Sequence, residues 1–256
     1  VMILPFAYMV STAFKPQAYV LETPPKFIPD PGTVDNFVQA WTTQDFSRYA
    51  LNSAFVSVTS TALAVWLSSM MAYAFARFDF PGKEWFFRAL LLGLMIPSMM
   101  LIIPQFVLTK QLHLIDNLWA LVLFYVSGNL ALNTFLLRSF FEGIPRELDE
   151  AMEVDGANVW TRYWRLAMPL ARPALATTVI FTFLATWDEF AWALTVISTE
   201  TKRTLPIAIQ LFHGQNSTQW GLVFAASLIA ILPVIVVYLI FQRHFVAGLT
   251  AGAVKG

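Results

Sequence analysis

Long stretches without a charged side chain are the feature that most limits what this chain can fold into. Residues 49–76 hold no charge over 28 residues, and 89–109 and 117–137 each hold none over 21. A helix of about 20 apolar residues crosses the hydrocarbon core of a bilayer. The runs are continuous and do not alternate between apolar and polar residues. They therefore predict membrane-spanning helices rather than the strands of a barrel.

The composition agrees with a chain that lies mostly in lipid. Hydrophobic residues make up 57% of the 256 residues and charged residues 12%, whereas soluble domains carry roughly 25% charged residues. The formal net charge is zero, so nothing indicates a nucleic-acid partner. The absence of cysteine excludes disulfides and thiolate metal sites. The three histidines, 113, 213 and 244, are too scattered to predict a metal site.

These observations predict an all-α membrane protein with six spans in a single transmembrane domain over residues 1–256. The first apolar run has only fourteen residues, too few to cross a bilayer, so we interpret it as the end of a spanning helix. Prolines 97, 104 and 233 lie inside spans and are expected to kink them. The predicted spans are about 1–14 (partial), 49–76, 86–109, 118–138, 173–197 and 221–242, with a long internal loop at 142–172.

Basic residues near the span ends predict the orientation. If the first span runs outward, the inside segments hold ten lysines and arginines and the outside segments hold six. Lysine and arginine are enriched in cytoplasmic loops. Both ends of the chain and the loop 142–172 are therefore expected in the cytoplasm, in a multi-pass membrane protein.

The loop 142–172 has the pattern of two short helices joined by a bend. Residues 146–154 place apolar side chains on one side and acids on the other. Gly156 permits a tight turn, and Asp155 is a candidate cap for the next helix, expected over 157–167. In that second helix the spacing predicts one apolar stripe. The stripe consists of Trp160, Tyr163, Trp164 and Ala167. Periodicity alone favours equally an amphipathic helix at the membrane interface and a docking element for a soluble partner.

The same loop resembles the cytoplasmic signature of ABC-importer permeases, Glu-Ala-Ala-x-x-x-Gly in its short form. Met152 departs from the second alanine of that signature. The C-terminal segment 242–256 and the stretches 11–16 and 187–190 also resemble the maltose-type carbohydrate subfamily, second permease subunit. The positions of the loop that match are Glu150, Ala151, Asp155, Gly156, Ala157, Pro169, Leu170 and Pro173.

The resemblance implies a six-transmembrane-helix ABC-importer permease bundle with cytoplasmic coupling helices, in the inner membrane of a bacterium or archaeon. It implies a second homologous permease subunit, two cytoplasmic ATPases that bind ATP and Mg²⁺, an external solute-binding protein and a sugar or oligosaccharide as solute. A sugar-like solute such as glycerol phosphate is the alternative. The chain itself has no Gly-x-x-x-x-Gly-Lys-Ser/Thr loop, so we expect it to be a transport subunit without a cofactor or catalytic residues. The residues expected to couple it to an ATPase are Glu150, Ala151, Met152, Asp155, Gly156 and Ala157.

Two further segments are candidate sites. The glycine-rich tail is expected, from the resemblance, to reach between the ATPase subunits through Gly248, Leu249, Thr250 and Gly252. Asp188 and Glu189 are acids inside a predicted span, which makes them candidates for the translocation path together with Trp187. The two acids can also mark the external interface or form hydrogen bonds within the bundle, and this structural role is slightly favoured.

Three other classes of function remain as alternatives. An ion-coupled secondary transporter would need an inverted repeat or broken helices around a midplane site. An intramembrane enzyme would need a nucleophile and a base within the spans. The third alternative is a structural membrane subunit without transport. Co-purification with an ATPase discriminates all three from an ABC importer.

Overall fold

A computed structural model of the chain describes residues 3–214 and 218–253, with side chains described outside positions 44 and 244–253. The described residues divide into two compact units. Unit 1 lies within 1–55, 115–118 and 188–236, and unit 2 within 56–114, 119–187 and 237–256. Helices α3 (Phe46–Arg77) and α13 (Trp220–Ala253) begin in unit 1 and continue in unit 2. Each unit is described by itself.

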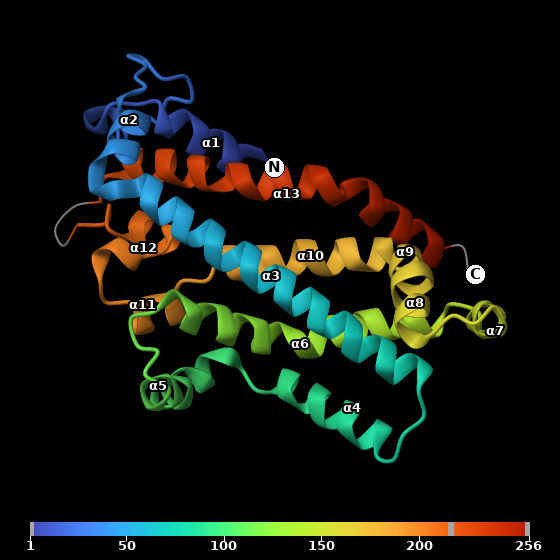
Figure 1. Ribbon diagram of the computed structural model, residues 1–256. Coiled ribbons are helices and arrows are strands. Elements are labelled where there is room, and N and C mark those ends of the chain that lie inside the picture. Colours follow the sequence, from blue (N-terminus) through green and yellow to red (C-terminus); the bar gives the residue numbers. More distant parts are fainter. Residues whose placement is uncertain (1–2, 215–217, 254–256) are drawn as a thin grey trace. The chain divides into compact units, whose positions relative to one another are not determined.

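Helical elements form both units, and the all-α membrane fold predicted from the sequence is confirmed (Figure 1). Unit 1 contains α1 (Ile3–Ala13), η1 (Gln17–Tyr19), α2 (Asp35–Thr42), η2 (Thr43–Asp45), α11 (Ala191–Val196), η6 (Glu200–Lys202) and α12 (Leu205–Gln210). Unit 2 contains α4 (Lys83–Leu92), η3 (Gly93–Met95), η4 (Ser98–Leu101), α5 (Ile102–Gln111), most of α6 (Leu118–Glu142), α7 (Arg146–Val154), α8 (Val159–Arg162), η5 (Tyr163–Ala167), α9 (Met168–Leu170) and α10 (Arg172–Trp187).

Three helices in the described part of the chain are long and apolar enough to cross a membrane by themselves: α3, α6 and residues Trp220–Arg243 of α13. The number rises to five if each of two bent helix pairs counts as one span, and α1 adds an apolar helix of 11 residues. Only 17% of the most apolar window of α13 is buried. Leu232, Leu239 and Ile240 on this helix are all more than half exposed. A surface of this kind suits contact with lipid.

Two predicted spans are not continuous helices. The span expected at 86–109 bends by 94° between Met95 and Ser98. Pro97 lacks a backbone N–H and disfavours a helical conformation of the residue before it, and Ile96 is extended. The kink expected from this proline is therefore confirmed. Pro233, by contrast, lies inside a helix that runs on to Ala253.

The span expected at 173–197 ends early, because α10 stops at Trp187 and a separate short helix, α11, begins at Ala191. The carboxylate of Glu189 accepts hydrogen bonds from the backbone N–H groups of Trp192 (2.7 Å) and Ala193 (3.1 Å). A carboxylate suits these otherwise unpaired amides and the positive end of the helix dipole. Glu189, which the sequence analysis expected inside a span, thus lies just before α11 and binds the backbone of its first turn.

Unit 1 is held together by side chains that bind backbone carbonyls. The amide of Asn36 in α2 donates to Ala13 O (2.8 Å) and Lys15 O (2.7 Å), which follow α1 in the chain. Near the start of α3, Asn52 donates to Arg203 O (2.9 Å), and the hydroxyl of Ser53 accepts from the backbone N–H of Leu205 (2.7 Å). The first two contacts hold α2 against the end of α1. The other two hold the start of α3 against the start of α12.

Unit 2 has α3, α6 and α10 at its centre (Figure 1). Ser68 in α3 donates to Leu130 O in α6 (3.4 Å), and Asn133 in α6 donates to Thr182 in α10 (2.8 Å). Hydrogen bonds of this kind between helices stabilise bundles in an apolar medium. A core cluster joins the C-terminal ends of α3 and α6 to the loop 142–172. Its members are Ala72, Tyr73, Ala76, Leu137, Phe141, Ile144, Tyr163, Ala167 and Ala171. The loop 142–172 is thereby seated on the ends of α3 and α6.

Candidate functional site

Helix α7 has the bounds predicted from the sequence, Arg146–Val154. It follows Pro145 and carries Glu147 and Asp149 in its first turn, where acids complement the positive end of the helix dipole. The helix ends with Gly156 at φ +80°. The N–H of Gly156 donates to Glu153 O and that of Ala157 to Met152 O, both at 2.9 Å. These two bonds define a Schellman turn, in which glycine avoids the penalty that a side chain would impose.

The cap of the second short helix differs from the prediction. Asn158, not Asp155, is the N-cap: its side-chain oxygen accepts from the backbone N–H of Thr161 (2.9 Å). Helix α8 therefore begins at Val159 instead of residue 157, and residues 163–167 continue as a π-helical turn. Asp155 cannot cap α8 because it is already the C-cap of α7, and the turn at Gly156 separates it from α8.

The faces of this loop are arranged differently from a simple apolar stripe. In α7 the buried residue is an acid, Asp149, whereas Leu148 is 43% exposed and Val154 88% exposed. The apolar stripe that was predicted over residues 157–167 packs inward with only two of its four side chains. Tyr163 and Ala167 are buried, while Trp160 and Trp164 are 58% and 50% exposed. Apolar side chains of both short helices thus face outward from unit 2.

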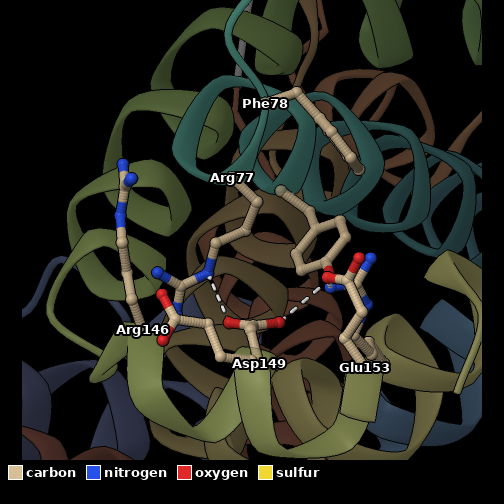
Figure 2. Close-up of a pocket in the computed structure, with 8 residues that line it drawn as sticks. Arg77, Phe78, Arg146, Asp149 and Glu153 are labelled. Atoms are coloured by element: carbon tan, nitrogen blue, oxygen red, sulfur yellow. Dashed lines mark hydrogen bonds and ion pairs between the residues drawn. The ribbon is translucent and has the colours of Figure 1, made fainter. Parts of the chain in front are cut away.

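The inward-facing acid is held by the last residue of α3. Arg77 Nε lies 3.0 Å from Asp149 Oδ2, and the two side chains are only 7% and 13% exposed. The guanidinium also donates to Ile144 O at 2.9 Å. On the other side, the Tyr73 hydroxyl donates to Asp149 Oδ1 at 3.4 Å. Figure 2 shows Arg77 and Asp149 pointing toward one another from α3 and α7. Sequence reasoning singled out neither residue.

A layer of aromatic rings lies behind this ion pair. The ring of Tyr73 packs edge-on against Phe141 and Tyr163, with centroids 5.8 Å and 5.3 Å away. The Tyr163 hydroxyl is 2.6 Å from the hydroxyl of Ser69 in α3. Both tyrosines are almost completely buried, so a buried polar group on each is satisfied by a hydrogen bond.

A pocket of about 340 Å³ opens beside the Arg77–Asp149 pair (Figure 2). It is lined by Tyr73, Arg77, Phe78, Arg146, Asp149, Glu150, Glu153 and Arg162. Arg162 and Glu153 form an ion pair at 2.5 Å. Glu150 is exposed, and in the described part of the chain no ion pair or hydrogen bond engages its carboxylate. Two of the three acids in the pocket are therefore paired inside the unit and one is available to a partner.

The structure places the other predicted coupling residues around Glu150. Ala151 follows it on the exposed side of α7, and Met152 is half-buried. Asp155 and Gly156 are exposed in the turn, and Ala157 is half-buried. All six predicted residues thus lie in one continuous segment that the structure keeps at the surface of unit 2.

The candidate residues of the translocation path lie at the boundary between α10 and the segment before α11. Trp187 ends α10 in unit 2, where its ring stacks on that of Phe183 with centroids 5.4 Å apart. Asp188 and Glu189 belong to unit 1, and the Glu189 carboxylate binds the first turn of α11. A role of these three residues in a translocation path stays a prediction.

The tail residues Gly248, Leu249, Thr250 and Gly252 continue the backbone of α13 as far as Ala253. Their side chains, and residues 254–256, lie outside what the structure describes. A contact of this tail with ATPase subunits stays a prediction.

Comparison with known proteins gives consistent matches over nearly the whole chain. The family described as "Binding-protein-dependent transport system inner membrane component" matches residues 31–250. The trehalose transport system permease protein SugB of Mycobacterium tuberculosis is 37% identical over 256 residues, covering 99% of this chain and 93% of that protein. The sulfoquinovosyl glycerol transport system permease protein SmoH of Agrobacterium fabrum is 36% identical, with coverage of 99% and 89%.

A solved structure shares the fold. A chain of a bacterial ABC transporter involved in the import of the acidic polysaccharide alginate superimposes with a TM-score of 0.83. The match covers 95% of this chain and 91% of that chain at 24% sequence identity. This likeness shows the arrangement of helices.

Proposed function

Because the chain belongs to the family of binding-protein-dependent transport system inner membrane components, we propose that it is a permease subunit of an ATP-driven importer and that α7 is the element moved by an ATPase subunit. The observation that carries this proposal is the orientation of α7. Its apolar residues Leu148 and Val154 face outward, and the unpaired carboxylate of Glu150 lies at the same surface. An amphipathic helix whose apolar face is directed away from its own unit suits a groove on another protein.

The partners follow from this assignment. A second, homologous permease would complete the translocation path, and two cytoplasmic ATPases would bind ATP and Mg²⁺. An external solute-binding protein would deliver the solute. The loop 142–172 and both chain ends lie in the cytoplasm in this proposal, supported by the excess of lysine and arginine on that side.

The solute is a sugar or an oligosaccharide in this proposal. The permeases that resemble the chain at 36–37% identity are named for trehalose and for sulfoquinovosyl glycerol, and both of these carry a sugar ring. The names of these relatives support a carbohydrate class and do not select one sugar for this chain.

The mechanism is a rigid-body displacement. When the ATPase dimer closes, the groove that holds α7 moves, and the permease helices that α7 contacts move with it. Opening of the path on one side of the membrane and closure on the other then follow from rotation of two bundles, one of the common forms of switching transition. In this scheme Glu150 pairs with a basic residue of the ATPase.

Charge reversal of Glu150 tests the proposal. A Glu150→Lys variant, co-expressed with the ATPase subunits, should insert normally but co-purify with the ATPases at least tenfold less well, and ATP-driven uptake of a radiolabelled sugar that the wild-type transporter imports should fall in parallel. Asp79→Lys is the matched control, because Asp79 lies just beyond α3 and is 85% exposed. Wild-type co-purification and uptake in Glu150→Lys would remove the proposed role of α7.

A further inference from the structure

Helix α7 contacts α3 through one inward-facing side chain, that of Asp149. Of its nine residues, Asp149 alone is buried. Its carboxylate meets Arg77 at 3.0 Å, and Arg77 is the last residue of α3. A displacement of α7 would therefore act on α3 mainly at this point. Helix α3 is one of the three described helices that can cross a membrane by themselves.

The guanidinium of Arg77 connects three elements at once. Its Nε forms an ion pair with Asp149 in α7 at 3.0 Å without hydrogen-bond geometry, and a terminal nitrogen donates to Ile144 O, in the segment between α6 and α7. Arginine suits such a junction, because its planar group presents several donors in a fixed geometry. The ends of α3, α6 and α7 thus meet on one side chain.

The pair is enclosed by groups that hold it in place. The Tyr73 hydroxyl approaches Asp149 from one turn earlier in α3, at 3.4 Å, and the ring of Tyr73 contacts that of Tyr163 beyond the Gly156 turn. Of the two other arginines that line the pocket, Arg162 is paired with Glu153 at 2.5 Å, and no ion pair of Arg146 is found among the described residues. Arg77 is the cation that contacts Asp149.

Burial makes this contact rigid in a way that a surface ion pair is not. Exposed pairs exchange readily with water and contribute little. A pair of which each side chain is less than 15% exposed has lost most of its hydration, so separating it leaves two poorly solvated charges. Force applied to α7 is therefore passed to α3 before the contact opens.

We propose that Arg77 and Asp149 form a positioning joint that converts displacement of α7 into movement of α3, and so couples ATP hydrolysis in the partner to movement of solute. This joint rests on the proposed function of α7. The two residues act through the helices that they connect and do not touch nucleotide or solute.

The joint is tested in the assembled transporter in nanodiscs, with ATP hydrolysis stimulated by the solute-binding protein measured beside transport in proteoliposomes. Asp149→Asn and Arg77→Gln should each retain the ATPase subunits but lower the solute transported per ATP hydrolysed about tenfold. A purely structural role would change assembly and leave this ratio unaffected.

Asp79→Asn is the matched control, because it removes one carboxylate from the exposed pair with Lys83 next to the end of α3 and should leave the ratio unchanged. Where Arg77→Gln does not assemble, Arg77→Lys keeps the cation and should couple within about threefold of wild type. A wild-type ratio in Asp149→Asn would overturn the joint.

The outcome for Glu150→Lys separates the two proposals. If that variant still binds the ATPases and transports solute, α7 is not the coupling element and the joint has no function to serve. If it loses both while Asp149→Asn retains the wild-type ratio, α7 docks as proposed and only the joint is wrong.

Discussion

Two aspartates, Asp149 in unit 2 and Asp116 in unit 1, each connect segments that are far apart in the sequence, and they do so with different partners. Asp149 faces a single cation, Arg77, and a hydroxyl at 3.4 Å. Asp116 accepts from the backbone N–H groups of Ser198 (3.0 Å) and Thr199 (2.9 Å) and from the Thr199 hydroxyl (2.6 Å). Lys202 adds an ion pair at 3.0 Å.

The difference lies in what remains when one partner is removed. Without Lys202, the carboxylate of Asp116 keeps three neutral donors, and Lys202 itself is 45% exposed. Without Arg77, the buried carboxylate of Asp149 keeps one long hydrogen bond. A junction built from many local donors resists the loss of any one of them. A junction built on one buried charge pair is lost when either of its two residues is removed. Such a dependence suits a contact that transmits force between two helices.

The largest expected effect comes from Arg77→Gln. Removing one partner of a buried ion pair costs about 3–5 kcal/mol, because Asp149 then carries an uncompensated charge. Amide hydrogen exchange of α7 in the detergent-solubilised transporter should accelerate at least a hundredfold. Lys83→Gln, which removes the cation of an ion pair whose acid is 85% exposed, serves as the control. Exchange of α7 in Arg77→Gln at the wild-type rate would remove the contrast between the two junctions.

An intermediate effect is expected when Asp116 is titrated. Burial alone would raise the pKa of its carboxyl, but the hydrogen bonds from Thr199, Lys202 and Ser198 outweigh burial and lower the pKa below its usual range. A carboxyl whose folded pKa is depressed stabilises the fold above its unfolded pKa of about 3.9, and this contribution is lost as the pH falls through the folded value.

The measurement is the exchange rate of the Ser198 and Thr199 amides, corrected for intrinsic rates, between pH 7 and pH 3. Protection should be constant down to about pH 5 and decline below about pH 4, by about 1 kcal/mol at pH 3, because each pH unit below the unfolded pKa removes about 1.4 kcal/mol. Asp116→Asn should lack this dependence. A decline of the same size in Asp116→Asn would assign it to another group.

The smallest effect is expected for Lys202→Gln. An exposed ion pair contributes less than about 1 kcal/mol, and the three donors of residues 198 and 199 remain in place. The apparent melting temperature of the transporter in detergent and the exchange rate of the Thr199 amide should change little. A destabilisation as large as that of Arg77→Gln would show that the junction at Asp116 also depends on a single charge.

Part of the candidate site could be predicted from the sequence. The bounds of α7 and the bend at Gly156 follow from local pattern and from the conformational freedom of glycine, and the structure has both. The sequence pattern predicts Asp155 as the cap of α8, whereas the cap is Asn158. Either side chain can cap a helix, and only the register of the turn decides between them. The break after Trp187 was missed, since an apolar run on both sides of two acids gives no sign of where a helix ends.

What the sequence alone determined is local: uncharged runs long enough to span a bilayer, and a short amphipathic segment ended by glycine. The tertiary structure decided which acid of α7 faces inward. Asp149 and Glu150 are adjacent and chemically similar, and the choice rests on Arg77, which lies more than seventy residues away in the chain. Local periodicity carries no information on such a partner, because the desolvation that makes the pair strong exists only when the ends of α3 and α7 have packed together.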